Sequence, residues 1–215
     1  TGAVEVLVDE LQIITKAAVP PIEVDDRVEA AEDVRMKYKY LDLRRPMMQQ
    51  RLMFRHRAAT AVRGYFNKNG FVEIETPLLV RSTPEGARDY IVPSRVNPGK
   101  FYALPQSPQL YKQILMIAGF DKYFQLAKCL RDEDLRTDRQ PEHTQIDFEM
   151  SFVDEKDVMR FVEGLYRHLF KEVPGIDLKT PFQTLTHAEA IAKYGIDKPD
   201  LRFGMELIDV TEIVK

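Results

Sequence analysis

The stretch YFQLAKCLRDEDLRTDRQPEHTQIDFEMSF, from Tyr123 to Phe152, contains two alternating runs of apolar and polar residues, separated by a charged loop. Because side chains alternate between the two faces of a strand, residues 123–131 and 144–152 each predict one apolar face and one mostly polar face. In the second run the apolar face has Ile146, Phe148, Met150 and Phe152, and the polar face has Gln145, Asp147, Glu149 and Ser151. The pattern predicts an antiparallel hairpin.

The polar face of this hairpin lies against either solvent or a polar ligand. In the first run Phe124, Leu126 and Leu130 share one face, and Gln125, Ala127, Cys129 and Arg131 share the other. The loop that follows, residues 132–142, is long for a hairpin and carries mixed charge, which is typical of functional or mobile loops. Arg131 can offer a planar fork of donors to a phosphate or carboxylate, and Glu133 would project to the same side.

The segments before the hairpin predict one long helix and two short strands. Residues 48–69 predict a helix whose apolar face carries Phe54, Ala58, Ala61, Val62 and Tyr65. Gly70 follows at the usual position of a left-handed helix cap. Strands are expected at residues 71–75, where Pro77 ends the run, and at residues 101–104.

Three more helices are predicted from their end signals. Ser107 would cap a helix that has Pro108 at its first position and ends at Gly119. Asp154 would cap a helix with an apolar stripe of Val158, Phe161, Leu165 and Leu169. Thr186 and Glu189 form a capping box for a last short helix that ends at Gly195. Helices and antiparallel strands in this order predict an α+β fold.

Four segments of the chain resemble the class II aminoacyl-tRNA synthetases, and in particular the bacterial-type aspartyl-tRNA synthetases. Residues 130–147, with the wording Arg-Asp-Glu-Asp-Leu-Arg-x-Asp-Arg-Gln-Pro-Glu, resemble the second signature motif of the class. Residues 70–79 resemble the first motif, which forms part of the dimer interface in the family. Residues 83–90 and 106–113 resemble the two segments that recognise aspartate. The resemblance implies the class II catalytic fold, an antiparallel sheet flanked by helices, in partial form.

The resemblance also implies a reaction. L-Aspartate would be activated with ATP to aspartyl-adenylate and then transferred to tRNA(Asp), which makes the family aspartate–tRNA ligases. Attack on the α-phosphate needs no protein nucleophile, but it needs two anions held together and the developing charge neutralised. Two alternatives are a chain that only dimerises or binds tRNA, and an enzyme that also charges tRNA(Asn). A relative acting on asparagine or lysine would differ around Glu85 and Lys112.

The same match assigns roles to individual residues. Arg131 would be the catalytic residue, bridging the substrate carboxylate and the α-phosphate. The aspartate contacts would be Glu85, Ser107, Gln109 and Asp147 at the amino group, Lys112 at the side chain, and Arg131. The ATP contacts would be Arg131, Asp132, Glu133, Gln140 and His143. His143 stands where the family has a phenylalanine that stacks on adenine, and an imidazole can still stack there.

The resemblance divides the chain into three regions. Residues 1–22 would be the end of an N-terminal OB-type anticodon-binding barrel with its linker, and the alternation of Val4, Val6 and Val8 predicts a strand there. Residues 23–202 would be the catalytic domain with motifs 1 and 2, and residues 203–215 the start of an inserted domain. The third motif and the acidic residues that hold Mg²⁺ are expected outside this chain, so no metal ligand is assigned.

Composition is that of an ordinary globular protein. The formal charge of −3 over 215 residues gives no overall attraction to nucleic acid, so RNA contacts would need local basic patches. Arg44 and Arg45 form either a solvated basic turn or such a contact. Cys129 is the single cysteine, which suits a reducing compartment, and no run approaches membrane-spanning length, so a cytoplasmic protein is expected. Structural or solvent roles are expected for His56, His168 and His187.

Overall fold

The computed structural model describes residues 3–27, 30–83, 85–136 and 139–213, which divide into units 1–60 and 61–215. The first unit contains α1 (Glu32–Lys37), α2 (Lys39–Asp42) and the start of α3 (Pro46–Lys68). The strand expected around Val4, Val6 and Val8 does not form, and these side chains are exposed. An alternating segment becomes a strand only when a neighbouring strand bonds its backbone, and the described residues place none beside it.

The structure gives Arg45 a role that differs from both interpretations offered for the basic turn, which were exposure to solvent and contact with RNA. It is 5% exposed, and its Nε lies 3.6 Å from Asp42 and 3.7 Å from Asp26. Asp42 is fully buried, and the adjacent Arg35 and Lys39 hold the pKa of its carboxyl below the ordinary value. Arg45 is therefore part of a buried ion cluster and is not available to solvent or RNA.

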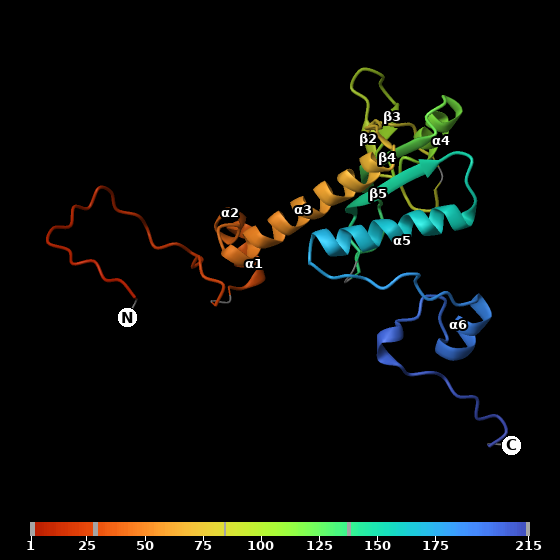
Figure 1. Ribbon diagram of the computed structural model, residues 1–215. Coiled ribbons are helices and arrows are strands. Elements are labelled where there is room, and N and C mark those ends of the chain that lie inside the picture. The colour runs from red at the N-terminus through yellow and green to blue at the C-terminus, as the bar shows by residue number, and fades with distance from the viewer. Residues whose placement is uncertain (1–2, 28–29, 84, 137–138, 214–215) are drawn as a thin grey trace. The chain divides into compact units, whose positions relative to one another are not determined.

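The second unit is built on a sheet with the strand order β1 (Val72–Glu73), β4 (Lys122–Leu130), β5 (Glu142–Met150). β4 and β5 form the expected antiparallel hairpin (Figure 1). β1 pairs parallel to β4, so the sheet that was expected to be antiparallel also contains one parallel pair. The strand expected at 71–75 shortens to β1, whose two residues pair with Tyr123 and Phe124 of β4. A second sheet pairs β2 (Ile91–Pro93) with β3 (Phe101–Ala103), and only β3 was expected.

The register of the hairpin defines its two faces. Gln125 pairs with Asp147, and Phe124 pairs with Phe148, so carboxylate and phenylalanine lie on opposite faces. The second strand ends at Met150, whose partner Lys122 is the first residue of β4. Phe152 consequently lies beyond the ladder, with φ of 57° and 97% of its surface exposed, and not on the apolar face.

The apolar face of the hairpin packs against α3 and α5 (Glu155–Glu172). Phe66 is fully buried and stacks on Phe124 with ring centroids 4.5 Å apart. Gly70, with φ of 79°, ends α3 as expected, and Phe71 N–H bonds the Phe66 carbonyl at 3.1 Å. The rings of Phe66 and Phe71 then meet edge to face at 4.9 Å, so the helix end is part of the core.

Two of the three helix starts predicted from capping signals form as expected. Asp154 caps α5 and Thr186 caps α6 (His187–Tyr194), each through a complete capping box, and η1 (Leu201–Phe203) follows. In α4 (Gln109–Ile117) the N-cap is Pro108 and not Ser107. No helix in the described parts of the chain combines the length and the apolar character needed to cross a membrane.

Candidate functional site

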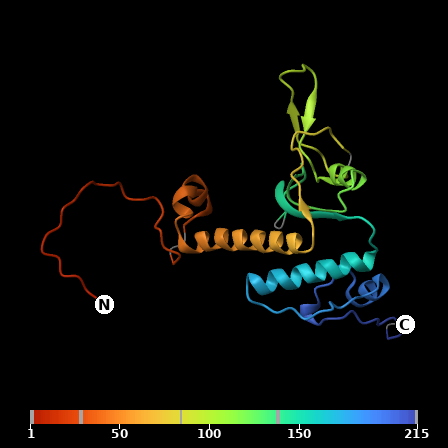
Figure 2. The same cartoon turned by 45° about the horizontal axis from the view of Figure 1, so that its top comes forward.

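The site lies on the face of β4 and β5 opposite the phenylalanine core, where α4 packs. Figures 1 and 2 both show α4 and α5 on opposite sides of the hairpin. Lys112 on α4 donates to Asp147 Oδ1 at 3.1 Å, and its ammonium lies 3.3 Å from Glu149. Around Asp147 the polar strand face therefore meets a helix and its lysine, whereas Glu149 on the same face keeps 33% of its side chain exposed.

Asp147 is held in an unusual electrostatic setting. Its side chain is 3% exposed, and its Oδ2 has no hydrogen-bond partner among the described residues. Burial raises the pKa of the Asp147 carboxyl above its ordinary value, although the charge of Lys112 opposes the shift. A buried carboxylate oxygen without a partner is costly, so this oxygen is suited to accept from a cationic ligand.

A buried polar network lies beside Asp147 on the same face. Gln125 Oε1 accepts hydrogen bonds from Tyr123 Oη at 2.9 Å and from Thr76 Oγ1 at 3.0 Å. Burial and the negative charge of Asp147 raise the pKa of Tyr123, so this phenol stays protonated. The network ties the segment after β1 to β4 and fixes the floor of the site.

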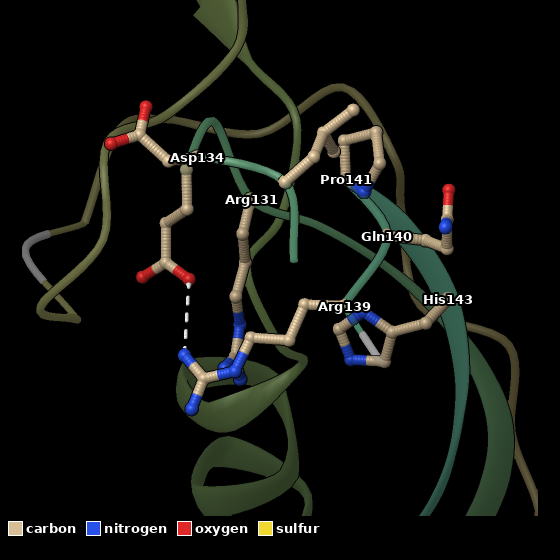
Figure 3. Close-up of a pocket in the computed structure, with 8 residues that line it drawn as sticks. Arg131, Asp134, Arg139, Gln140, Pro141 and His143 are labelled. Carbon is tan, nitrogen blue, oxygen red and sulfur yellow. Dashed lines mark ion pairs between the residues drawn. The ribbon is translucent and has the colours of Figure 1, made fainter. Parts of the chain in front are cut away.

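Arg131 follows β4 directly and enters a pocket of about 400 Å³. The pocket is lined by Arg131, Glu133, Asp134, Leu135, Arg139, Gln140, Pro141 and His143 (Figure 3). Arg131 Nε is buried without a partner among the described residues. Glu133 lies 4.0 Å from Arg139, while Figure 3 shows Gln140 directed away from Arg131. A cationic donor without a partner at the base of a pocket is suited to bind an anion.

Four of the five predicted ATP contacts line this pocket. The exception, Asp132, lines a neighbouring hollow of about 320 Å³, and its N–H donates to the Arg88 carbonyl at 3.0 Å. Glu133 borders both spaces. Asp132 therefore acts in the structure as a backbone link between the loop after β4 and the segment around Arg88.

The predicted amino-group contacts come from three segments: the one that carries Glu85, the start of α4 with Ser107 and Gln109, and β5 with Asp147. Ser107 donates to Glu85 at 2.7 Å, and Thr83 also donates to Glu85 at 3.2 Å. Gln109 lies at the start of α4, where its N–H bonds the Ser107 hydroxyl at 3.3 Å. Lys112 and Asp147 meet directly, so the structure brings both groups of predicted aspartate contacts to the region around α4.

The described residues do not form a metal site. No three His, Cys, Asp or Glu side chains converge within them, and Asp147 and Glu149 face the Lys112 ammonium. The donor set present does not fit a magnesium ion, which prefers oxygen ligands without a competing cation.

The sequence matches a known family over most of its length. The family described as "tRNA synthetases class II (D, K and N)" matches residues 31–214. The chain belongs to the class II tRNA synthetases. Within this family, the Aspartate–tRNA(Asp/Asn) ligase of Thermoanaerobacter sp. (strain X514) is 60% identical to the chain over 214 residues. The Aspartate–tRNA ligase of Clostridium perfringens (strain 13 / Type A) is 59% identical over 215 residues.

These class II synthetase relatives are longer than the chain. Both alignments cover 100% of the chain but 36% of the relative. The Aspartate–tRNA(Asp/Asn) ligase of Desulfotalea psychrophila (strain LSv54 / DSM 12343), 58% identical over 215 residues, is covered to 35%. The chain thus spans about a third of the length of the curated relatives it matches.

Several residues of this class II synthetase site were not predicted from sequence. They are Gln106, Tyr123, Gln125 and Thr76, whose polar side chains hold the site together, and Arg139 in the pocket. Gln106 directly precedes Ser107 inside one of the recognised segments, and Gln125 lies on the predicted polar face.

Proposed function

We propose that this chain is the part of an aspartate–tRNA ligase that binds L-aspartate and ATP, on a class II catalytic fold. Two buried groups that have no hydrogen-bond partner among the described residues carry the proposal: Arg131 Nε, which can donate to an anion, and Asp147 Oδ2, which can accept from a cation. Aspartate and ATP together present carboxylates, phosphates and one ammonium. The names of the similar proteins support the amino acid assignment.

Charge complementarity distinguishes the groups of the amino acid. The α-amino group would donate to Asp147 and Glu85, with Ser107 and Gln109 nearby. The side-chain carboxylate would bind Lys112, an ammonium with three donors, of which the structure engages one with Asp147. A substrate with a neutral side chain would offer no anion to this lysine, which would keep only its contacts with Asp147 and Glu149 among the described residues.

Arg131 would stabilise the first chemical step. The carboxylate oxygen of aspartate attacks the α-phosphate of ATP, pyrophosphate leaves, and aspartyl-adenylate forms. The guanidinium of Arg131 would hold both anions together and neutralise the charge that develops on the phosphoryl oxygens. Glu133, Gln140 and His143 would bind the nucleotide from the wall of the pocket, and Asp132 would support them from the adjoining hollow.

The remaining parts of the proposal concern the full-length protein. Residues 23–202 would be the N-terminal part of the catalytic domain, residues 1–22 the end of an OB-type anticodon-binding barrel with its linker, and residues 203–215 the start of an inserted domain. The protein would charge tRNA(Asp) in the cytoplasm. Mg²⁺ would accompany ATP, and no step is assigned to it because the described residues do not fit it.

A homodimer through the motif 1 region is part of the proposal. Val72, Leu78 and Leu79 expose about half of their surfaces, at 48%, 49% and 54%. A segment with exposed apolar side chains is suited to burial against a second copy. Light scattering on the full-length protein should give twice the chain mass, and the mass of one chain would contradict this part.

The test is aspartate-dependent ATP–pyrophosphate exchange by the full-length protein, with asparagine, lysine and glutamate as controls. Exchange with aspartate alone is the expected result. Exchange that is supported by lysine, asparagine or glutamate would overturn the assignment. A complete lack of exchange with every amino acid tested would overturn it too. Charging assays with both tRNA(Asp) and tRNA(Asn) then define the tRNA range, which differs among the names of the relatives.

A further inference from the structure

Gln106 bonds to both backbone groups of one residue on the segment that carries Glu85. Its Nε2 donates to the Ala87 carbonyl at 2.9 Å, and its Oε1 accepts from the Ala87 N–H at 3.0 Å. The same Nε2 also donates to Asp89. Gln106 is 4% exposed, so these bonds form where water does not compete.

These contacts close the base of the segment formed by residues 82–89, near Ala87 and Asp89. They leave the tip of the segment, at Glu85, exposed. Asp89 accepts a second hydrogen bond from Ser82, which joins the two ends of the segment. Glu85 is exposed at the tip, where only hydroxyl groups of Ser107 and Thr83 contact it among the described residues. Gly86 lies between Glu85 and Ala87. Its φ of 100° is a backbone conformation that favours glycine.

The residues beside Gln106 connect this base to the rest of the site. The Pro105 carbonyl accepts from the Leu130 N–H at 2.9 Å, directly before Arg131. Ser107, on the other side, bonds Glu85 at 2.7 Å. Three consecutive residues thus contact the end of β4, the base of the segment and its tip. Moving Gln106 would change the position of Glu85 relative to Arg131.

We propose that Gln106 is a positioning residue for amino acid binding, which acts through Ala87 and Asp89 to hold Glu85 within reach of the substrate α-amino group. This inference rests on the proposed function of the site. Gln106 itself is too enclosed by its own partners to contact the substrate. Without the base contacts, the tip would sample other positions, and binding would require ordering it again.

The expected signature is selective. Gln106→Ala should raise the KM for aspartate about tenfold, which is the size of a lost hydrogen bond to a buried group. The KM for ATP should stay within about twofold, because the pocket that Arg131 lines does not include Gln106. A general structural defect would weaken both substrates together.

A double-mutant cycle with Glu85 separates positioning from other roles. If Gln106 acts through Glu85, Gln106→Ala should change the KM for aspartate less than about twofold in a Glu85→Gln background. An equally large effect in both backgrounds would overturn the proposal. So would an equal rise in the KM values for aspartate and ATP.

A charge-swapped pair provides the rescue. Gln106→Glu alone places a second carboxylate beside Asp89 and removes the donor to Ala87, so it should also weaken aspartate. Adding Asp89→Asn supplies an amide donor to the new carboxylate and should recover part of the affinity. Failure of the double variant to improve on Gln106→Glu would count against the contact with Asp89. Because this pair conserves volume, it also serves if Gln106→Ala does not fold.

The assays use the full-length protein and ATP–pyrophosphate exchange. Absence of aspartate-dependent exchange by the unaltered protein would overturn the proposed function itself. Normal exchange by that protein, together with an unchanged aspartate KM in Gln106→Ala, would overturn only the role of Gln106. Thermal midpoints of each variant identify those that are unfolded.

Discussion

Lys112 on α4 and Asp147 on β5 form a buried ion pair with 3.1 Å between Nζ and Oδ1, across 35 residues of sequence. The pair holds the first turn of the helix to the hairpin. It also places an ammonium beside a carboxylate whose second oxygen has no hydrogen-bond partner among the described residues. A zwitterionic amino acid with an acidic side chain complements that arrangement.

Lys112→Ala in the full-length protein should weaken aspartate much more than ATP. Loss of a buried charge partner costs about 2–5 kcal/mol, so the KM for aspartate should rise by at least about 30-fold. Steady-state ATP–pyrophosphate exchange measures both KM values. Lys156→Ala on the exposed side of α5 is the matched control and should change neither. Equal losses for both substrates would exclude Lys112 as the specificity residue.

Acidification should weaken aspartate binding through Asp147. Because burial raises the pKa of this carboxyl, it takes up a proton at a higher pH than an exposed aspartate and then cannot accept from the substrate ammonium. Calorimetric titration with aspartate over a pH series should show the affinity falling on the acid side. Asp147→Asn should bind more weakly throughout and lack that part of the pH dependence. If the affinity of Asp147→Asn for aspartate falls on the acid side as steeply as that of the unaltered protein, another group causes this pH dependence.

The same raised pKa affects stability in the opposite sense: acidification weakens substrate binding but favours the folded state. A carboxyl whose folded pKa lies above its unfolded pKa contributes to folding below about pH 4. That contribution is lost as the pH rises through the folded pKa. Asp147 therefore lowers stability in the pH range where it is ionised and ready to bind the substrate.

Arg131→Lys should retain the charge but lose the planar fork. A lysine cannot hold a carboxylate and a phosphate oxygen in one plane, so the rate of adenylate formation should fall by at least about 100-fold. Single-turnover formation of aspartyl-adenylate separates this step from substrate binding. Arg160→Lys, an exposed arginine on α5, provides the control. Adenylate formation at the normal rate would remove Arg131 from the chemistry.

Gly164 in α5 should not tolerate a side chain. A Cβ at this position would lie 2.2 Å from Tyr65 Oη, which donates to the Phe161 carbonyl at 3.1 Å. Gly164→Ala should therefore destabilise the protein by about 1–3 kcal/mol, despite the better helix propensity of alanine. Thermal unfolding measures the change. Adding Tyr65→Phe should recover part of it, and a stability equal to the unaltered protein in Gly164→Ala alone would contradict the packing.

Cys129 should be inert in the folded protein. It is fully buried, and burial raises the pKa of its thiol to about 11. At pH 8 the thiolate fraction is then on the order of one in a thousand. Iodoacetamide labelling followed by peptide mass spectrometry should find Cys129 unmodified in the native protein and modified in urea. Rapid native labelling would contradict its burial.

Sequence patterns predicted the elements that depend on neighbouring residues. Asp154 and Thr186 begin their helices where local hydrogen bonds require it, and Gly70 ends α3 for the same reason. The exact face of α3 was not predictable, because Tyr65 and Phe66 are neighbouring aromatic residues and either of them could face the core. Only the position of Phe124 and Phe161 makes Phe66 the centre of the core.

Contacts between distant segments account for the other differences. The parallel pairing of β1 depends on where α3 delivers the chain, which no alternation within residues 71–75 encodes. The polar face of the hairpin was expected to meet solvent or ligand, and Lys112 covers part of it. The family resemblance predicted most of the site residues, namely Arg131, Lys112, Asp147, Ser107 and Glu85. The roles of Gln106 and Gln125 could be recognised only from their hydrogen-bond partners in the structure.

The pairing of Gln125 with Asp147 and of Phe124 with Phe148 limits how the length of this protein can vary. One residue inserted in or deleted from β4 or β5 would move phenylalanines to the ligand side and carboxylates into the aromatic core. Stability and substrate recognition would be lost in the same event. Changes in length between homologous proteins should therefore accumulate in the connection between Arg131 and Pro141, and the two strands should keep a constant number of residues.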